Sequence, residues 1–139
     1  MREVIFRGKQ TDNGEWVEGN LIKAENFYFI IPLVSNGSFD KVKNVLKFLN
    51  PCYYINPETV GQFTGLVDKY GERKWEGDIF KFGDHLYIIE WDADELTFRA
   101  YEPFETDYSV DLAEFSANEI EVIGNIHDNP ELLKGEVQE

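Results

Sequence analysis

Residues 63–80 place the strongest limits on what this chain can fold into, because turn signals alternate there with short apolar runs. Glycines flank a hairpin tip, Asp68-Lys69-Tyr70-Gly71, and Glu76-Gly77-Asp78 then leads into the apolar pair Ile79-Phe80. Tight turns followed at once by an apolar strand are typical of a small β-barrel. The segment carries no catalytic chemistry, so it predicts architecture and not activity.

The N-terminal third predicts further strands. Residues 4–9 and 15–22 have strand-like patterns on either side of a turn at residues 11–14, which predicts a β-hairpin. Residues 27–33 predict another strand, with Pro32 near its end because proline cannot donate to a ladder.

Residues 38–49 favour a short helix. Phe39, Val42, Leu46 and Leu49 follow helical spacing, and Ser38 is a suitable N-cap. Prolines follow closely, and the breaker cluster at residues 56–61 comes after a strand-like stretch at residues 52–55.

The second half predicts a three-strand meander. Residues 79–82, 85–91 and 96–101 are separated by the turns Gly83-Asp84 and Asp92-Ala93-Asp94-Glu95. Both faces of the middle strand are apolar, as expected where a small sheet curls on itself or meets another part of the protein, and we predict one core shared by the two parts. One face holds His85, Tyr87, Ile89 and Trp91, and the other holds Leu86 and Ile88.

The C-terminal part predicts one more strand and a short helix. Residues 119–126 alternate, which places Ile120 and Val122 inward and Glu119 and Glu121 outward. Residues 129–133 predict a short helix with Asn129 as N-cap and a proline at the first helical position.

The net charge of −14 is unevenly distributed. Residues 1–82 hold 11 acidic and 11 basic side chains, whereas residues 83–139 hold 16 acidic and 2 basic ones. Binding to nucleic acid requires clustered Lys and Arg at the phosphates, so the charge argues against direct nucleic-acid binding.

The sequence predicts a cytoplasmic protein without a membrane segment. Cys52 is the only cysteine and has no intrachain disulfide partner. No apolar stretch approaches the roughly 20 residues that span a bilayer, and the N-terminal residues lack a signal-peptide core.

Three segments together resemble the YopX family of phage and prophage proteins. They are residues 1–7, residues 60–66 with their sequel at 76–79, and residues 120–126 followed by 129–133. The order and the spacing also match, and the resemblance is weakest between residues 24 and 54. It implies a mainly β protein with an SH3-like barrel in its C-terminal part, encoded by a phage or prophage and located in the host cytoplasm. It brings no catalytic residues.

We therefore expect a mainly β fold with one or two short helices. An N-terminal β-rich subdomain, residues 1–60, packs on an SH3-like barrel, residues 61–139, which ends in a short helix. A high aromatic content of 15% agrees with a mostly β protein.

The candidate catalytic and ligand-binding residues favour structural roles. His85, His127 and Cys52 lack zinc-site spacing, and the turn of Asp92, Asp94 and Glu95 lacks the EF-hand pattern. Glu90 and Asp92 could share a sheet face as a glycosidase pair does, but carboxylate pairs are common by chance among 27 acidic residues. Four glycines could suggest a phosphate-binding loop: Gly61, Gly65, Gly71 and Gly77. None of them is followed by the Lys-Ser/Thr pair that such a loop requires, so turns are the better interpretation.

We accordingly predict no catalytic, cofactor-binding or metal-binding residues, no cofactor and no enzyme activity. The expected function is a non-enzymatic protein-interaction module whose partner is a host or phage protein. Several aromatic residues exceed what a small core needs, and packing between the two subdomains is favoured over a partner-binding groove. They are Trp16, Trp75, Trp91, Tyr53, Tyr54, Tyr70 and Tyr101.

Two alternatives remain. One is a hydrolase that uses Glu90 or Asp92. The other is an acidic mimic of DNA that inhibits a host DNA-binding protein through outward carboxylates of the C-terminal part. These carboxylates are Glu102, Glu105, Asp107, Asp111, Glu114, Glu119 and Glu121.

Overall fold

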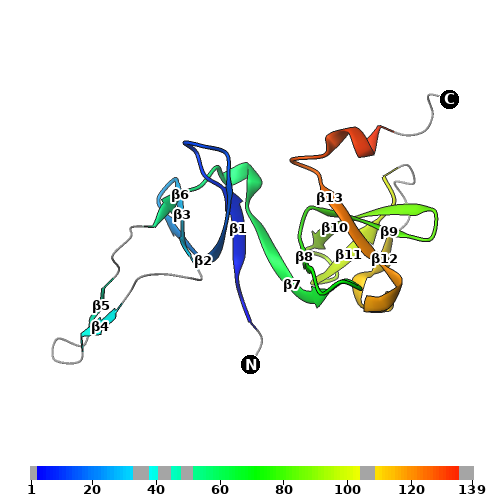
Figure 1. The fold of residues 1–139 in the computed structure, drawn as a ribbon, viewed down its shortest axis with the longest axis horizontal. Helices are drawn as coiled ribbons and strands as arrows, with labels where there is room; N and C mark the ends of the chain where they lie inside the picture. The colour runs from blue at the N-terminus through cyan, green and yellow to red at the C-terminus, as the bar shows by residue number, and fades with distance from the viewer. Residues whose placement is uncertain (1–2, 33–37, 41–44, 48–51, 104–108, 135–139) are drawn as a thin grey trace. The chain divides into compact units, whose positions relative to one another are not determined.

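A computed structural model describes residues 3–32, 38–40, 45–47, 52–103 and 109–134 (Figure 1). The fold is mainly β, as predicted: strands hold 55% of the described residues, and no helix among them reaches seven residues. The chain divides into two compact units, Glu3–Gln62 and Phe63–Glu139, here called unit 1 and unit 2. A core shared by the two remains a prediction.

Unit 1 is an antiparallel sheet with the strand order β6-β3-β2-β1. The predicted N-terminal hairpin is confirmed by β1 (Phe6–Lys9) and β2 (Trp16–Ala24), and the next strand by β3 (Phe27–Pro32). The short strand β6 (Tyr53–Tyr54) pairs with β3. The core of the unit contains Ile5, Ile30 and Ile55.

The helix expected at residues 38–49 is wrong where the structure describes the segment. Strands β4 (Ser38–Asp40) and β5 (Val45–Lys47) pair antiparallel, with Phe39 opposite Leu46. Ser, Phe, Asp, Val and Asn are weak helix formers, and in so short a segment the apolar spacing fits a hairpin as well as a helix. Residues 41–44 and 48–49 lie outside the described part.

The breaker cluster at residues 56–61 forms a 3₁₀ helix, η1 (Pro57–Thr59), which leads into β7 (Gly61–Val67). The Asn56 side chain caps η1 by accepting a hydrogen bond from the Glu58 N–H at 3.1 Å. Gly61 and Gln62 of β7 pair with β1 in unit 1. In unit 2, Phe63 and Val67 pair with β8 (Arg73–Trp75), with a bulge between them.

Unit 2 contains a five-stranded antiparallel sheet with the order β12-β11-β10-β9-β13. The predicted meander is confirmed by β9 (Asp78–Phe82), β10 (His85–Asp92) and β11 (Thr97–Tyr101). The short strand β12 (Ser109–Asp111) forms one edge, and β13 (Glu121–Asn125) pairs with β9 at the other. Whether this unit is an SH3-like barrel remains a prediction.

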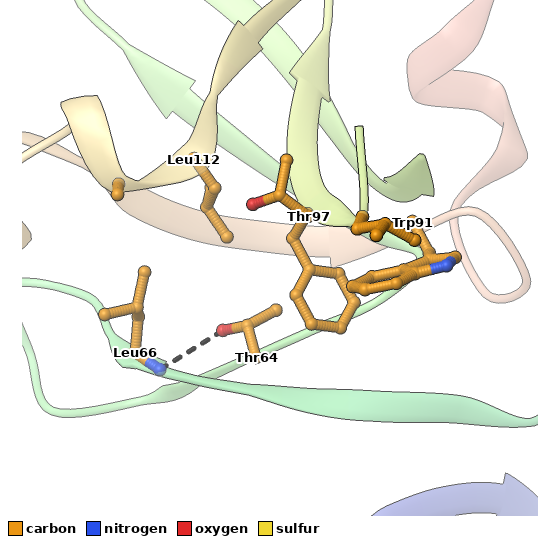
Figure 2. A pocket seen from close by; sticks show the side chains of 8 residues that line it. Thr64, Leu66, Trp91, Thr97 and Leu112 are labelled. Atoms are coloured by element: carbon orange, nitrogen blue, oxygen red, sulfur yellow. Dashed lines mark hydrogen bonds between the residues drawn. The ribbon is translucent and has the colours of Figure 1, made fainter. Parts of the chain in front are cut away.

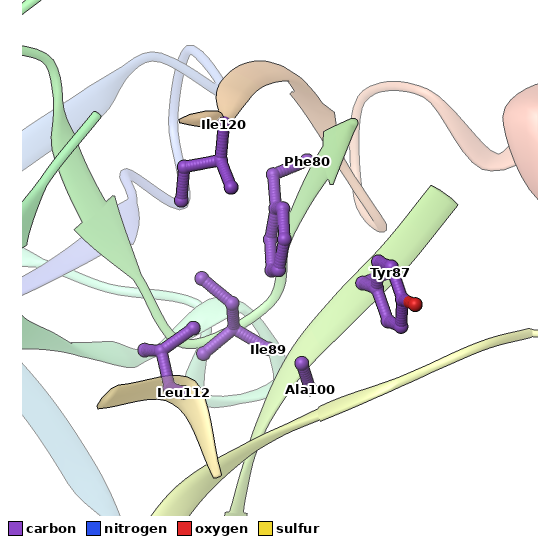
Figure 3. Close-up of a cluster of buried hydrophobic side chains, with 6 residues drawn as sticks. All are labelled: Phe80, Tyr87, Ile89, Ala100, Leu112 and Ile120. Carbon is purple, nitrogen blue, oxygen red and sulfur yellow. The ribbon is translucent and has the colours of Figure 1, made fainter. Parts of the chain in front are cut away.

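Six buried side chains form the core of unit 2 and converge from separate elements (Figure 3). They are Phe80, Tyr87, Ile89, Ala100, Leu112 and Ile120. Tyr87 and Ile89 are the inward residues of β10, whereas His85 and Trp91, expected on the same apolar face, are exposed. The strand extends beyond the core at both ends, and its terminal side chains therefore meet solvent.

Short 3₁₀ helices replace two features expected near the C-terminus. Glu119 belongs to η3 (Ala117–Glu119), so β13 starts later than predicted, and a bulge after Val122 interrupts its alternation. The terminal helix is η4 (Pro130–Leu133), with proline in its first turn as predicted. Asn129 occupies the N-cap position as predicted, but its side chain does not cap η4, because its Oδ1 accepts a hydrogen bond from the Asn125 N–H at 3.1 Å.

The buried carboxylate of Asp68 joins the β7–β8 turn to β13. Its Oδ1 accepts hydrogen bonds from the N–H groups of Tyr70 and Glu72, both at 2.9 Å, and its Oδ2 accepts one from the Val122 N–H at 3.0 Å. The Lys69 N–H adds a bond to the Ile120 carbonyl at 3.2 Å. The turn is thereby fixed against the edge of the sheet.

The same hydrogen bonds keep Asp68 ionised. Burial opposes ionisation, but the N–H groups of Val122, Glu72 and Tyr70 and the charge of Lys74 outweigh it and lower the pKa of the carboxyl. Lys74 is itself buried on β8, and burial lowers the pKa of its ammonium group while Asp68 opposes that shift.

Replacing Asp68 should destabilise the protein strongly. Asp68→Ala leaves three N–H groups without their acceptor, and we expect a loss of about 2–4 kcal/mol in the free energy of unfolding, measured with urea. Asp84→Ala, at the exposed tip between β9 and β10, is the matched control and should change stability by less than about 0.5 kcal/mol. Equal stabilities of the two variants would contradict the role of Asp68.

The pH dependence has a definite sign. Because folding lowers the pKa of Asp68, its charged form stabilises the fold above its unfolded-state pKa of about 4, and this contribution is lost as the pH falls through the folded-state pKa. The stability difference between the wild type and Asp68→Asn should therefore shrink between pH 7 and pH 3.

Candidate functional site

An open groove of about 300 Å³ lies within unit 2. Figure 2 shows Thr64 and Leu66 of β7 on one side and Thr97, Leu112 and Trp91 on the other. The groove is lined by Thr64, Leu66, Trp91, Leu96, Thr97, Phe98, Leu112 and Ala113. The last two belong to η2 (Leu112–Glu114), so the lining comes from β7, the β10–β11 hairpin and η2.

Large apolar side chains are exposed around this groove. Trp91 is 46% exposed, Leu96 74% and Leu66 38%. In the described part of unit 2 only Val67 and Tyr70 are comparable, and Val67 directly follows Leu66. Single exposed apolar residues are normal, but a cluster of them around a hollow marks an interaction site.

The local structure fixes the β7 wall of the groove. Gly65 has a φ of 92° within the bulge, a conformation that glycine adopts without strain. The Thr64 hydroxyl donates to the Lys74 carbonyl at 2.8 Å and accepts from the Leu66 N–H at 3.2 Å. Leu66 is therefore held in place although its side chain is exposed.

In the opposite wall of the groove, Leu96 has an unfavourable backbone conformation. Leu96 has a φ of 58°, in the left-handed region that residues with a Cβ adopt at a cost. Its N–H donates to the Asp92 carbonyl at 2.8 Å, and Asp92 Oδ1 accepts from the N–H groups of Asp94 and Glu95. Trp91 packs edge-on against Phe98 with ring centroids 5.0 Å apart.

These contacts give Asp92 a structural role. Besides the turn N–H groups, the Tyr101 hydroxyl donates to its Oδ2 at 3.4 Å, and the Arg99 Nε lies 4.0 Å away. Burial, then the charge of Asp92, raises the pKa of Tyr101. Neither Glu90 nor Asp92 lines the groove, so the carboxylate pair considered for hydrolysis is not placed there.

The candidate metal ligands are dispersed. Nδ1 of His85 lies 3.2 Å from Oε1 of Glu102, whereas His127 is half-buried near Gly77. Cys52 is exposed in unit 1. Throughout the described residues, no three His, Cys, Asp or Glu side chains gather closely enough to hold a metal ion.

The glycines singled out in the sequence occupy turns and strands. Gly71 and Gly77 have φ values of 81° and 92° at the turns before β8 and β9, and Gly61 begins β7 beside β1. With Gly65 in the bulge, the four are distributed over separate backbone features.

The aromatic residues differ in their environment. Trp75 is buried and packs against Phe63. The guanidinium carbon of Arg7 lies over the Trp16 ring, 4.5 Å from the ring centroid. Tyr54 is exposed and packs on Phe27 and Phe29, Tyr53 is half-buried, and Tyr70 is exposed on its turn. Trp91 is thus the exposed tryptophan of the described chain.

Several carboxylates of the acidic C-terminal part have partners within the protein. Glu121 lies 3.8 Å from the Lys69 Nζ, Asp111 pairs with Arg99 at 2.5 Å, and Glu119 Oε1 accepts the Ser116 N–H. Glu114 is exposed. Glu105 and Asp107 lie outside the described residues.

Sequence reasoning named Trp91 among seven aromatic residues but favoured packing between the subdomains for them, and it did not predict the groove. Leu66 lies in the turn-rich run 63–80 and Leu96 begins the strand predicted at residues 96–101, and contacts across the groove are not encoded in either local pattern. The available signal was a leucine directly after the polar turn at residues 92–95.

Comparison with known proteins shows a match to one family model. The family model described as YopX protein matches residues 5–134, which is most of the chain. None of the curated proteins compared with the chain matches it. None of the helices in the described part of the chain has the length and hydropathy of a membrane-spanning helix.

Leu96→Gly should stabilise the protein by up to about 1 kcal/mol, because glycine removes the cost of the left-handed conformation and the leucine side chain is mostly exposed. Glu25→Gly is the matched control, since Glu25 has nearly the same backbone φ as Leu96, 57°, in the β2–β3 turn of unit 1. Urea unfolding of both variants measures the effect, and a destabilised Leu96→Gly protein would contradict the assigned strain.

Proposed function

The chain belongs to the YopX family, and we propose that it is a non-enzymatic protein-interaction module whose groove in unit 2 binds a short segment of a partner protein. The gathering of Trp91, Leu96 and Leu66 around one groove carries this proposal. Exposing these side chains brings no folding benefit, and Leu96 is held exposed at a conformational cost. A bound partner would remove their apolar surface from water.

The wider setting follows the family resemblance. The proposal treats unit 2 as an SH3-like barrel, since such barrels bind peptides in aromatic-lined grooves between loops. The partner is then a host or phage protein in the bacterial cytoplasm. Direct binding to nucleic acid is not expected, because 16 acidic and 2 basic side chains occupy residues 83–139.

The local contacts favour this proposal over the two alternatives. The hydrogen bonds of Asp92 to its own turn give it a structural role instead of a place in a hydrolytic pair. Internal partners of Glu119, Glu121 and Asp111 reduce the number of carboxylates that a DNA mimic would present.

Selection from an unbiased library of 12-residue peptides tests the function. We expect the full-length protein to enrich specific peptides, and Trp91→Ala to weaken their binding about tenfold or more, since it removes a large aromatic contact. Phe27→Ala, which truncates an aromatic side chain 55% exposed in unit 1, is the matched control and should leave binding unchanged.

Two results would overturn the proposal. One is a selection that enriches no peptide. The other is enriched peptides that bind equally well to Trp91→Ala and to the wild type. Circular dichroism and urea unfolding of Trp91→Ala distinguish loss of binding from loss of fold, because the exposed indole contributes little to the core.

A further inference from the structure

We infer that the partner segment is basic: one apolar side chain enters the groove, and a Lys or Arg on either side of it lies against an acidic rim. This inference rests on the proposed function and adds the chemistry of the partner. Two observations support it: carboxylates neighbour the groove lining along the chain, and several basic side chains of unit 2 are held elsewhere.

Exposed carboxylates lie next to residues of the groove lining at two places along the chain. Asp94 and Glu95 lie in the turn that ends at Leu96, and Glu114 directly follows the lining residue Ala113 in η2. Glu95 and Glu114 are thus direct chain neighbours of lining residues, and Asp94 lies one residue further from Leu96. Glu90 is left out of the rim, because alternation along β10 turns it to the face opposite Trp91.

Three basic side chains of unit 2 are engaged away from the groove. Arg99, one of only two basic residues between Gly83 and Glu139, donates to Ser109 Oγ at 2.8 Å and to Asp111 Oδ1. Lys69 pairs with Glu121, and Lys74 is buried. The rim therefore contributes a negative potential that a basic partner complements.

The groove limits the apolar part of the ligand. A volume of about 300 Å³ is at the small end of binding pockets, which favours a single bulky side chain over a folded surface. Its walls are an aromatic pair, Trp91 and Phe98, and the aliphatic side chains of Leu66 and Leu96. An acidic rim around such walls fits an extended basic peptide with one aliphatic or aromatic anchor.

Three synthetic 12-residue peptides built on one library-selected sequence test this inference by isothermal titration of the full-length protein. The first keeps the apolar anchor with Lys on both sides, the second has Glu in place of Lys, and the third has Ser in place of the anchor. We expect the first peptide to bind at least about tenfold more tightly than the second, and the third not to bind.

A charge-neutralised variant locates the effect. Asp94→Asn/Glu95→Gln should weaken the Lys-flanked peptide about 3- to 10-fold at low salt, and added salt should shrink that difference. The matched control is Asp84→Asn/Glu102→Gln at the other end of β10, whose eight residues span roughly 23 Å. This control removes the same number of charges and should leave the affinity unchanged.

The outcomes separate this inference from the proposed function. If Lys- and Glu-flanked peptides bind equally and both need Trp91, the groove is a binding site but its partner is not basic. If the Ser-substituted peptide binds as well as its parent, the acidic surface binds without the groove and the inference is wrong. If the library yields no peptide at all, the proposed function falls with it.

Discussion

The carboxylate of Asp68 is the constraint on which the rest of unit 2 depends. It accepts three backbone hydrogen bonds, two inside the β7–β8 turn and one from Val122 of β13, and so fixes a hairpin to the edge of a sheet that is distant in sequence. Since β7 also supplies Thr64 and Leu66, one wall of the groove is positioned by this turn. Burying a charge is costly, and the hydrogen bonds offset that cost only while all three donors are in place.

The groove concentrates features that reduce stability. Trp91, Leu96 and Leu66 leave apolar surface in water, and Leu96 adopts a left-handed conformation that a glycine would adopt more easily. The surrounding contacts are well formed: Asp92 fixes the turn, and Thr64 fixes Leu66. A rigid framework that holds exposed apolar side chains in fixed positions is what a peptide-binding surface requires, because little ordering remains to be done on binding.

Local patterns predicted most strands of this fold but not its long-range contacts. The N-terminal hairpin and the meander β9-β10-β11 were predictable because turn residues separate short apolar runs. The segment 38–49 was not, since its strand-favouring Phe and Val alternate with helix-favouring Lys and Leu, and its apolar spacing fits a hairpin as well as a helix. Asn129 was expected to cap its own helix but accepts from Asn125, and Glu119 was expected on a strand but caps η3. The groove depends on β7, a hairpin and η2 meeting in space, and only Trp91 among its residues stood out in the sequence.

The most direct test of the account is to map where a selected peptide binds, by nuclear magnetic resonance on the isotope-labelled full-length protein. The account predicts that the largest chemical-shift changes fall on the amides of Thr64, Leu66 and Leu96 and on the indole N–H of Trp91, whereas the buried indole of Trp75 is unchanged. Changes centred on unit 1, or on the hollow lined by Lys69, Lys81 and Glu121, with Trp91 unaffected, would contradict it.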